Sequence, residues 1–268
     1  EQHLTKVMAL IGSSIGLVFA LSMVAAPLLY AGIGMPGIFF LTGMLSLLAI
    51  IVVLNYVPAA PAIPRQAGWS SFVEVLGHPQ LLRMNFGVFV LHLMQTAMWI
   101  VVPAALISSG ALPVGDHWMV YLPAVLLSFV VMVPAIIAAE KHGKMRLVFN
   151  GAIVLLLAVQ LGFGFFGHGR YALFFWLLLF FIAFNVLEAI QPSLIARIAP
   201  AHAKGAALGV YNTTQSLGLF LGGLLGGLLV KFLGTSAVWL VCALLALIWL
   251  GVGLSMALPA ARVRQAAA

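Results

Sequence analysis

The sequence contains few charged residues. Asp, Glu, Lys and Arg make up 6% of its 268 residues, and 64% of the residues are hydrophobic. Soluble globular domains carry roughly 25% charged residues, which their water-facing surfaces require. The scarcity of charge therefore excludes soluble enzymes and soluble binding modules, and it indicates a protein that is integral to a membrane.

Cysteine and metal-binding patterns are also scarce. The single cysteine, Cys242, lies in an apolar stretch, which excludes a disulfide within the chain and a zinc site built on cysteine pairs. Glu188 and His92 would supply two members of an intramembrane catalytic site, but no third member and no H-E-x-x-H sequence accompanies them. We therefore expect no enzymatic activity, no metal and no cofactor.

Long apolar runs dominate what is present. A run of about 20 apolar residues is long enough to cross a bilayer as a helix. The sequence predicts an all-α integral membrane fold with eight transmembrane helices joined mostly by short connections. The predicted spans are residues 7–30, 37–57, 84–107, 118–138, 147–167, 171–196, 205–230 and 235–258.

Basic residues outnumber acidic ones and are unevenly distributed. The chain has 12 Lys and Arg against 5 Asp and Glu. Ten of the basic residues fall at one end of the predicted spans, and only Arg170 and Lys231 fall at the other. Basic residues accumulate on the cytoplasmic side of membrane proteins, so both ends of this chain are predicted to be cytoplasmic. The basic excess thus reports topology, and we expect no nucleic-acid partner.

One connection is long and divides the chain. Residues 58–83 begin with a Pro/Ala-rich stretch, typical of an extended linker. Ser71-x-x-Glu74 then resembles a capping box and predicts a short amphipathic helix on the cytosolic membrane surface. The predicted organisation is two helices in residues 1–57, this linker, and six helices in residues 84–268.

A weak internal repeat supports that division. The first span begins Lys6-Val-Met-Ala-Leu and the seventh begins Lys204-Gly-Ala-Ala-Leu, an offset of six helices. A six-helix repeat predicts a parent of twelve helices. Four N-terminal helices are then expected upstream or from a partner chain.

Several short motifs in this order resemble the major facilitator superfamily, in particular its proton-coupled efflux antiporters. The motifs are Asn85-Phe-Gly with Leu91-His92, Asp116-His117-Trp118, Phe184-Asn185 with Glu188-Ala189, and Gly209-Val-Tyr211 with Gln215. The resemblance implies helices five to twelve of a twelve-helix fold: the last two helices of the N-terminal half and the whole C-terminal half. It also implies a monomeric secondary transporter in the bacterial inner (plasma) membrane.

Glu188 is the only acidic residue inside an apolar run, where a carboxylate costs roughly 2.5–3.5 kcal/mol at mid-bilayer. Burial disfavours the charged form of a carboxyl group, so such a group can bind a proton and release it when water enters. His92 lies at the same depth, about 12 Å from the cytosolic ends of the spans. In the family fold both helices line the central cavity, and the two residues are candidates for proton coupling. A structural glutamate and a histidine bonded to a backbone carbonyl are the alternatives.

Polar side chains near this pair are candidates for a substrate cavity. The run at 211–216 equally fits hydrogen bonding between helices. A mostly apolar cavity with amides and hydroxyls suits small, partly apolar organic compounds. The candidates are Gln95, Thr96, Trp99, Asn185, Gln191, Tyr211, Asn212 and Gln215.

Glycines at four-residue spacing predict close helix packing, which small residues allow in membranes. They are Gly12 and Gly16 on the first span and Gly218, Gly222 and Gly226 on the seventh.

A charged loop follows the fourth span. Glu140, Lys141, Gly143, Lys144 and Arg146 match the acidic, glycine and basic places of a family loop motif, with Ile136 at its leading glycine. The resemblance implies a cytosolic gate latch, and topology plus solubility is the plainer interpretation.

These features predict proton-driven export of small organic compounds by alternating access. The expected partners are the lipid bilayer, protons and a small-molecule substrate. Import of a metabolite remains an alternative. So does a truncated membrane fragment or scaffold that does not transport, because the chain holds only two helices of one half.

Overall fold

The computed structural model describes residues 2–58, 69–109 and 111–257, and it describes side-chain surroundings from residue 18 onward, apart from residues 19, 20 and 23. The Pro/Ala-rich linker over 59–68 lies outside these ranges. Contacts divide the chain into two units, Glu1–Gln66 and Ala67–Ala268, which are described separately.

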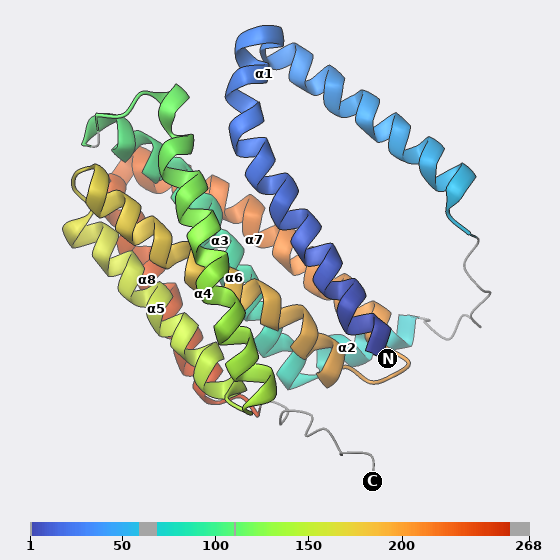
Figure 1. Ribbon diagram of the computed structural model, residues 1–268. Coiled ribbons are helices and arrows are strands. Elements are labelled where there is room, and N and C mark those ends of the chain that lie inside the picture. Colours follow the sequence, from blue (N-terminus) through green and yellow to red (C-terminus); the bar gives the residue numbers. More distant parts are fainter. Residues whose placement is uncertain (1, 59–68, 110, 258–268) are drawn as a thin grey trace. The chain divides into compact units, whose positions relative to one another are not determined.

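The first unit is the helical segment α1 (Gln2–Tyr56), which consists of two helices that meet at Gly34. Figure 1 shows them as the two blue arms of a hairpin. Gly34 has φ 65° and ψ −179°, a backbone conformation that is essentially confined to glycine and costs other residues roughly 1–3 kcal/mol. The predicted loop between spans one and two is thus reduced to a break at one glycine. Gly12 and Gly16 lie on the first arm, where side-chain surroundings are outside the description.

The second unit is a bundle of long helices preceded by a short one (Figure 1). Its elements are α2 (Trp69–Gly77), α3 (Pro79–Ser108), the 3₁₀ turn η1 (Val114–Asp116), α4 (Trp118–Lys141), α5 (Met145–Phe166), α6 (Arg170–Ile198), α7 (Lys204–Leu233) and α8 (Thr235–Leu254). With the two arms of α1, the described part of the chain has the eight long helices that the sequence predicts.

Length and composition agree with a membrane location. In the part of the chain that the structure describes, seven helical stretches are long and apolar enough to cross a membrane, the first of them Val24–Tyr56 across the Gly34 break. The boundaries of α4 to α8 lie within four residues of the predicted ones. The fold is therefore all-helical and multi-pass.

Two predicted helix starts are wrong. The span expected to begin at residue 84 begins at Pro79, because the His78 ring nitrogen accepts from the backbone N–H of Leu81 at 3.4 Å and proline fits the first helical turn. Ser71 does not cap the short helix. It lies inside α2 with its side chain buried.

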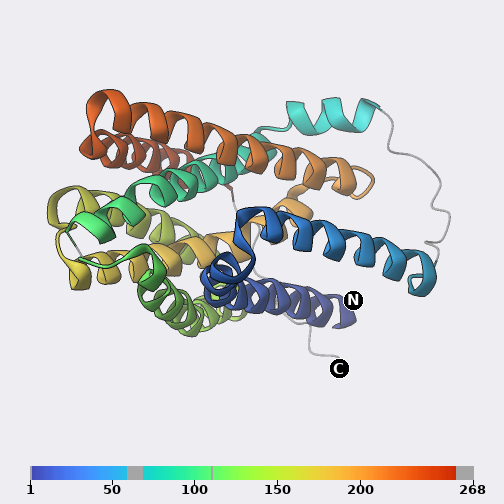
Figure 2. The same cartoon turned by 90° about the horizontal axis from the view of Figure 1, so that it is seen from above.

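Helix α3 lies at the centre of the second unit. It packs most extensively against α7 and also touches α6, α8 and α2, while α5 packs against α8 and α4 against α6. Figure 2 shows α3 and α7 side by side along most of their length. Residues on α3, α6 and α7 can therefore meet within one small volume.

The α3–α7 contact depends on glycine. A Cβ on Gly218 would lie 2.5 Å from the carbonyl oxygen of Phe89, and one on Gly226 would lie 3.2 Å from the Cα of Ala97. A Cβ on Gly222 would overlap the carbonyl oxygen of Leu93. The structure thus places the three packing glycines predicted on α7 where the two backbones approach closely.

We expect Gly222→Ala to destabilise the protein by about 1–3 kcal/mol, because the added methyl group has to displace the α3 backbone. Gly227→Ala is the matched control on the same helix, since a Cβ there meets nothing within 4 Å. That substitution should be neutral or stabilising by up to about 1 kcal/mol through helix propensity. Thermal unfolding in detergent, followed by tryptophan fluorescence, measures both. Equal melting temperatures would contradict the packing role of Gly222.

Candidate functional site

His92 sits on α3 inside the bundle, with only 3% of its surface exposed. Its Nδ1 atom lies 3.0 Å from the carbonyl oxygen of Val88, one turn earlier in the same helix. A carbonyl can only accept, so Nδ1 carries a hydrogen and donates it. The ring of Phe184 on α6 packs edge-on against the imidazole, with 5.6 Å between ring centroids. The imidazole is therefore fixed in orientation, with Nε2 pointing away from its own helix.

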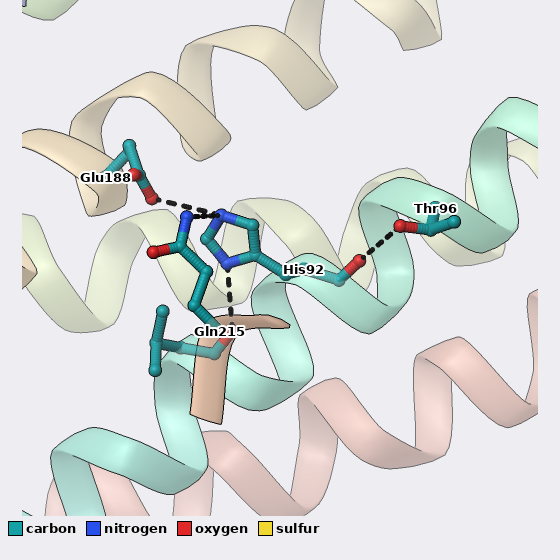
Figure 3. Close-up of polar contacts among 5 residues, drawn as sticks. His92, Thr96, Glu188 and Gln215 are labelled. Carbon is teal, nitrogen blue, oxygen red and sulfur yellow. Dashed lines mark hydrogen bonds and ion pairs between the residues drawn. The ribbon is translucent and has the colours of Figure 1, made fainter. Parts of the chain in front are cut away.

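Side chains from two other helices converge on Nε2 of His92 (Figure 3). The amide nitrogen of Gln215 on α7 lies 2.8 Å from Nε2, and Oε2 of Glu188 on α6 lies 3.5 Å from it. The structure thus brings together the two residues proposed for proton coupling and one residue proposed for the cavity. The three come from three different helices.

Glu188 occupies a more open position than His92. Its side chain is 36% exposed and that of His92 is 4% exposed. Beyond its approach to the imidazole, Oε2 has no hydrogen-bond partner in the described part of the chain. Glu188 is also close enough to Tyr211 on α7 to act on its hydroxyl group electrostatically. The carboxyl group thus lies between a buried base and a more accessible side of the bundle.

Two buried polar side chains lie near this carboxyl group. Gln191, one turn after Glu188, is fully buried, and Tyr211 is 2% exposed. The amide atoms of Gln191 and the hydroxyl of Tyr211 have no hydrogen-bond partner among the described residues. Buried polar groups usually bond to protein or to ordered water. Their burial favours a role inside the bundle over direct contact with a substrate.

The remaining cavity candidates have varied surroundings. The hydroxyl of Thr96 donates to the carbonyl of His92 at 3.1 Å. Trp99 packs against Tyr121, with 4.8 Å between ring centroids. Gln95 is half-buried and Asn212 is exposed. Only part of the candidate set therefore lies in reach of the His92 imidazole.

Asn185 contacts a residue that the sequence did not single out. Its amide nitrogen donates to the hydroxyl of Ser128 on α4 at 2.7 Å, and this hydroxyl in turn donates to the carbonyl of Val125 at 2.6 Å. Ser128 is the only hydroxyl-bearing Ser or Thr of α4, which is a signal the sequence contained. The contact ties α6 to α4 three residues before Glu188.

The predicted gate loop joins α4 to α5, with Gly143 at φ 68°. Glu140 forms an ion pair at 2.5 Å with Arg197 at the end of α6, a residue outside the loop. Neither Lys141 nor Lys144 pairs with Glu140 among the ion pairs of the described residues. The observed ion pair therefore connects α4 to α6.

Further polar contacts gather at the same end of the bundle. Arg146 donates to the carbonyl of Leu254 at 2.5 Å, and Arg83 donates to that of Ser255 at 3.1 Å. Both carbonyls lie at the C-terminal end of α8, where carbonyl groups have no partner within the helix. The two arginines thus attach α5 and α3 to α8.

Long apolar helices around a half-buried site of histidine, glutamate and glutamine define a multi-pass helical membrane protein. A comparison with protein-family models matches residues 84–268 to the Major Facilitator Superfamily. The chain belongs to this superfamily.

Curated relatives agree with this assignment. The chain is 37% identical, over 97% of its length, to "Inner membrane transport protein YajR" of Escherichia coli (strain K12). It is 26% identical, over 91% of its length, to an "Uncharacterized transporter" of Buchnera aphidicola subsp. Baizongia pistaciae (strain Bp). The chain spans 58% of the first relative and 66% of the second, so it corresponds to a part of each.

A double-mutant cycle should detect the ion pair between α4 and α6. Both side chains are partly exposed, 24% for Arg197 and 34% for Glu140, so solvent screening limits the expected coupling to about 0.5–1 kcal/mol. The cycle compares Glu140→Gln, Arg197→Gln and the double variant by unfolding in detergent. Lys141→Gln is the control, since its ammonium group has no ion-pair partner in the described ranges. Strict additivity of the two substitutions would contradict the pairing.

Proposed function

We propose that the full-length protein is a secondary active transporter, driven by the proton gradient, that exports small, partly apolar organic compounds. The proposal starts from the superfamily and from relatives whose printed names call them transporters. Because the chain corresponds to a part of those relatives, activity is proposed for the whole protein.

The observation that carries proton coupling is the approach of His92 and Glu188 within apolar helices. Their facing atoms lie 3.5 Å apart, and one side chain is buried while the other is a third exposed. Ionisable groups inside membrane spans are costly and are usually functional. A carboxyl group beside a fixed imidazole can take up a proton from the accessible side and share it with the buried base.

The substrate class follows from the chemistry around this pair. The half-buried and exposed candidates offer amides, hydroxyls and an indole ring. No predicted span carries Lys or Arg near its middle, so a fixed cation to hold an anionic substrate is lacking there. A neutral or cationic organic compound with substantial apolar surface fits better than a sugar or a phosphate.

Transport would proceed by alternating access. In such transporters the substrate and coupling-ion sites lie near the bilayer midplane, and the two halves rock around them. Proton binding on the outer side and substrate binding on the inner side would then alternate. We further propose a monomer in the bacterial inner membrane, with both ends of this chain cytoplasmic, as the basic residues favour.

Glu188→Gln should abolish proton coupling. In proteoliposomes of the full-length protein, proton movement that accompanies export of a fluorescent, partly apolar compound should fall at least about tenfold, since the carboxyl group that faces His92 no longer titrates. A pH-sensitive dye inside the vesicles measures the proton movement.

Glu74→Gln is the matched control for this experiment, because Glu74 is an exposed carboxyl group that pairs with His202 at the end of the bundle. It should leave coupling at the wild-type level. Unchanged proton movement in Glu188→Gln would overturn the proposed coupling.

The gate latch makes a separate prediction about rate. If the Glu140–Arg197 pair stabilises one of the two access states, Glu140→Gln should change the transport rate about two- to fivefold, which corresponds to about 0.5–1 kcal/mol. Lys141→Gln should leave the rate unchanged. Initial rates of export of the same compound test both variants, and a wild-type rate in Glu140→Gln would exclude the latch.

A further inference from the structure

We propose that Gln215 is a positioning residue for the proton on His92. Its side-chain amide donates to the neutral imidazole and turns over to accept from the protonated one. The inference rests on the proposed proton coupling and deepens it, because it states how α7 responds to the proton.

Two side chains compete for one lone pair on His92. Because Nδ1 of His92 donates to the carbonyl of Val88, the neutral imidazole has a lone pair and no hydrogen at Nε2. The amide nitrogen of Gln215 at 2.8 Å and Oε2 of Glu188 at 3.5 Å both face that lone pair. One lone pair accepts one strong hydrogen bond, so the amide and a protonated carboxyl group compete for it. The shorter distance belongs to the amide.

Transfer of a proton from Glu188 to His92 changes Nε2 from a hydrogen-bond acceptor into a donor. The O–H bond at Oε2 of Glu188 breaks, an N–H bond forms at Nε2 of His92, and a carboxylate remains opposite an imidazolium. Nε2 now donates, so the NH₂ group of Gln215 would face another donor. A half turn of the amide presents its oxygen instead. A glutamine can serve both states because it carries donors and an acceptor on one side chain.

Helices α3 and α7 cannot easily move apart to separate the two facing donors, Nε2 of His92 and the NH₂ group of Gln215. Gly218 and Gly222, one and two turns after Gln215, hold the α7 backbone against that of α3 at Phe89 and Leu93. The distance between the two helices is therefore fixed close to the site. On α7, the response to protonation of His92 is therefore rotation of the Gln215 amide. On α6, it is the attraction between the imidazolium and the Glu188 carboxylate.

Few other titratable groups bear on this equilibrium. From α6, Glu188 faces the imidazole, and from α7, Tyr211 is the titratable side chain nearest to that carboxyl group in its electrostatic effect, since Glu188 acts on its hydroxyl group. The only titratable side chain of α8 is Cys242, which is buried. The only one of α2 is Glu74, which pairs with a histidine at the end of the bundle. A change at Gln215 should therefore be visible in the titration of His92.

The test measures protonation of His92 directly. Full-length protein with ¹⁵N-labelled histidine is placed in lipid vesicles, and the Nε2 signal is followed by solid-state NMR as a function of pH. The signal is assigned by its loss in His92→Asn. Two variants at the same position are compared with wild type. Gln215→Glu supplies a side chain that accepts a hydrogen bond from the protonated imidazole. Gln215→Met supplies a side chain of similar length that neither donates nor accepts one.

Gln215→Glu should shift the midpoint of Nε2 protonation to higher pH than Gln215→Met by at least about one pH unit, a tenfold change in proton concentration. Gln215→Met should lie near wild type, because the amide serves both states. Equal midpoints in the two variants, whether at the wild-type value or displaced from it by the same amount, would overturn the switch. A purely structural role predicts such equal midpoints.

A measurement on the wild-type protein covers the case in which the variants fail to fold. With histidine and glutamine both labelled, the ¹⁵N–¹⁵N distance from Nε2 of His92 to the amide nitrogen of Gln215 should be 2.8 Å at high pH and longer at low pH. A constant distance would refute amide rotation.

The experiments distinguish a failure of the proposed role of Gln215 from a failure of the proposed proton coupling. Loss of proton movement in Glu188→Gln together with a constant distance would retain the coupling and reject the role of Gln215. Unchanged proton movement in Glu188→Gln would reject the coupling whatever the histidine signals show.

Discussion

The close approach of α3 and α7 is the constraint on which the rest of the site depends. Glycines remove the side chains that would otherwise separate the two backbones. That proximity allows the amide of Gln215 to reach an imidazole anchored on the neighbouring helix. With larger residues at these positions, the amide would be too far away for a direct hydrogen bond. Packing and polar chemistry therefore share one interface.

The helices and the central pair could be predicted from sequence because each depends on a simple rule. Apolar runs of sufficient length give spans, and Glu188 is conspicuous as a charge inside one of them. The family resemblance made the helices of His92 and Glu188 neighbours, and the two side chains do meet, although the helix ends from which their equal depth was counted lie at Pro79 and Ile198 instead. The hairpin in α1 was predictable in position, although the sequence did not indicate that one glycine would form the break.

Other contacts could not be predicted, because they depend on the rotation of each helix about its own axis. Gln191 and Tyr211 are as polar in sequence as Gln215, yet both are buried without a hydrogen-bond partner among the described residues, whereas Gln215 is half-buried and contacts His92. Glu140 had basic neighbours in its own loop, and the three-dimensional arrangement offered it Arg197 instead. A long-range ion pair of this kind leaves no periodic signal. Ser128 likewise becomes meaningful only when Asn185 is seen opposite it.

The two arginines on the C-terminal carbonyls of α8 link membrane orientation to folding. Basic residues at helix ends bias which side of the membrane a loop occupies, and here Arg83 and Arg146 also occupy carbonyls that would otherwise lack partners. Replacing either one to alter the charge balance would also free a helix end. Basic residues elsewhere in the loops can therefore be exchanged with an effect on membrane orientation alone, whereas replacing Arg83 or Arg146 would also remove a hydrogen bond that holds the end of α8.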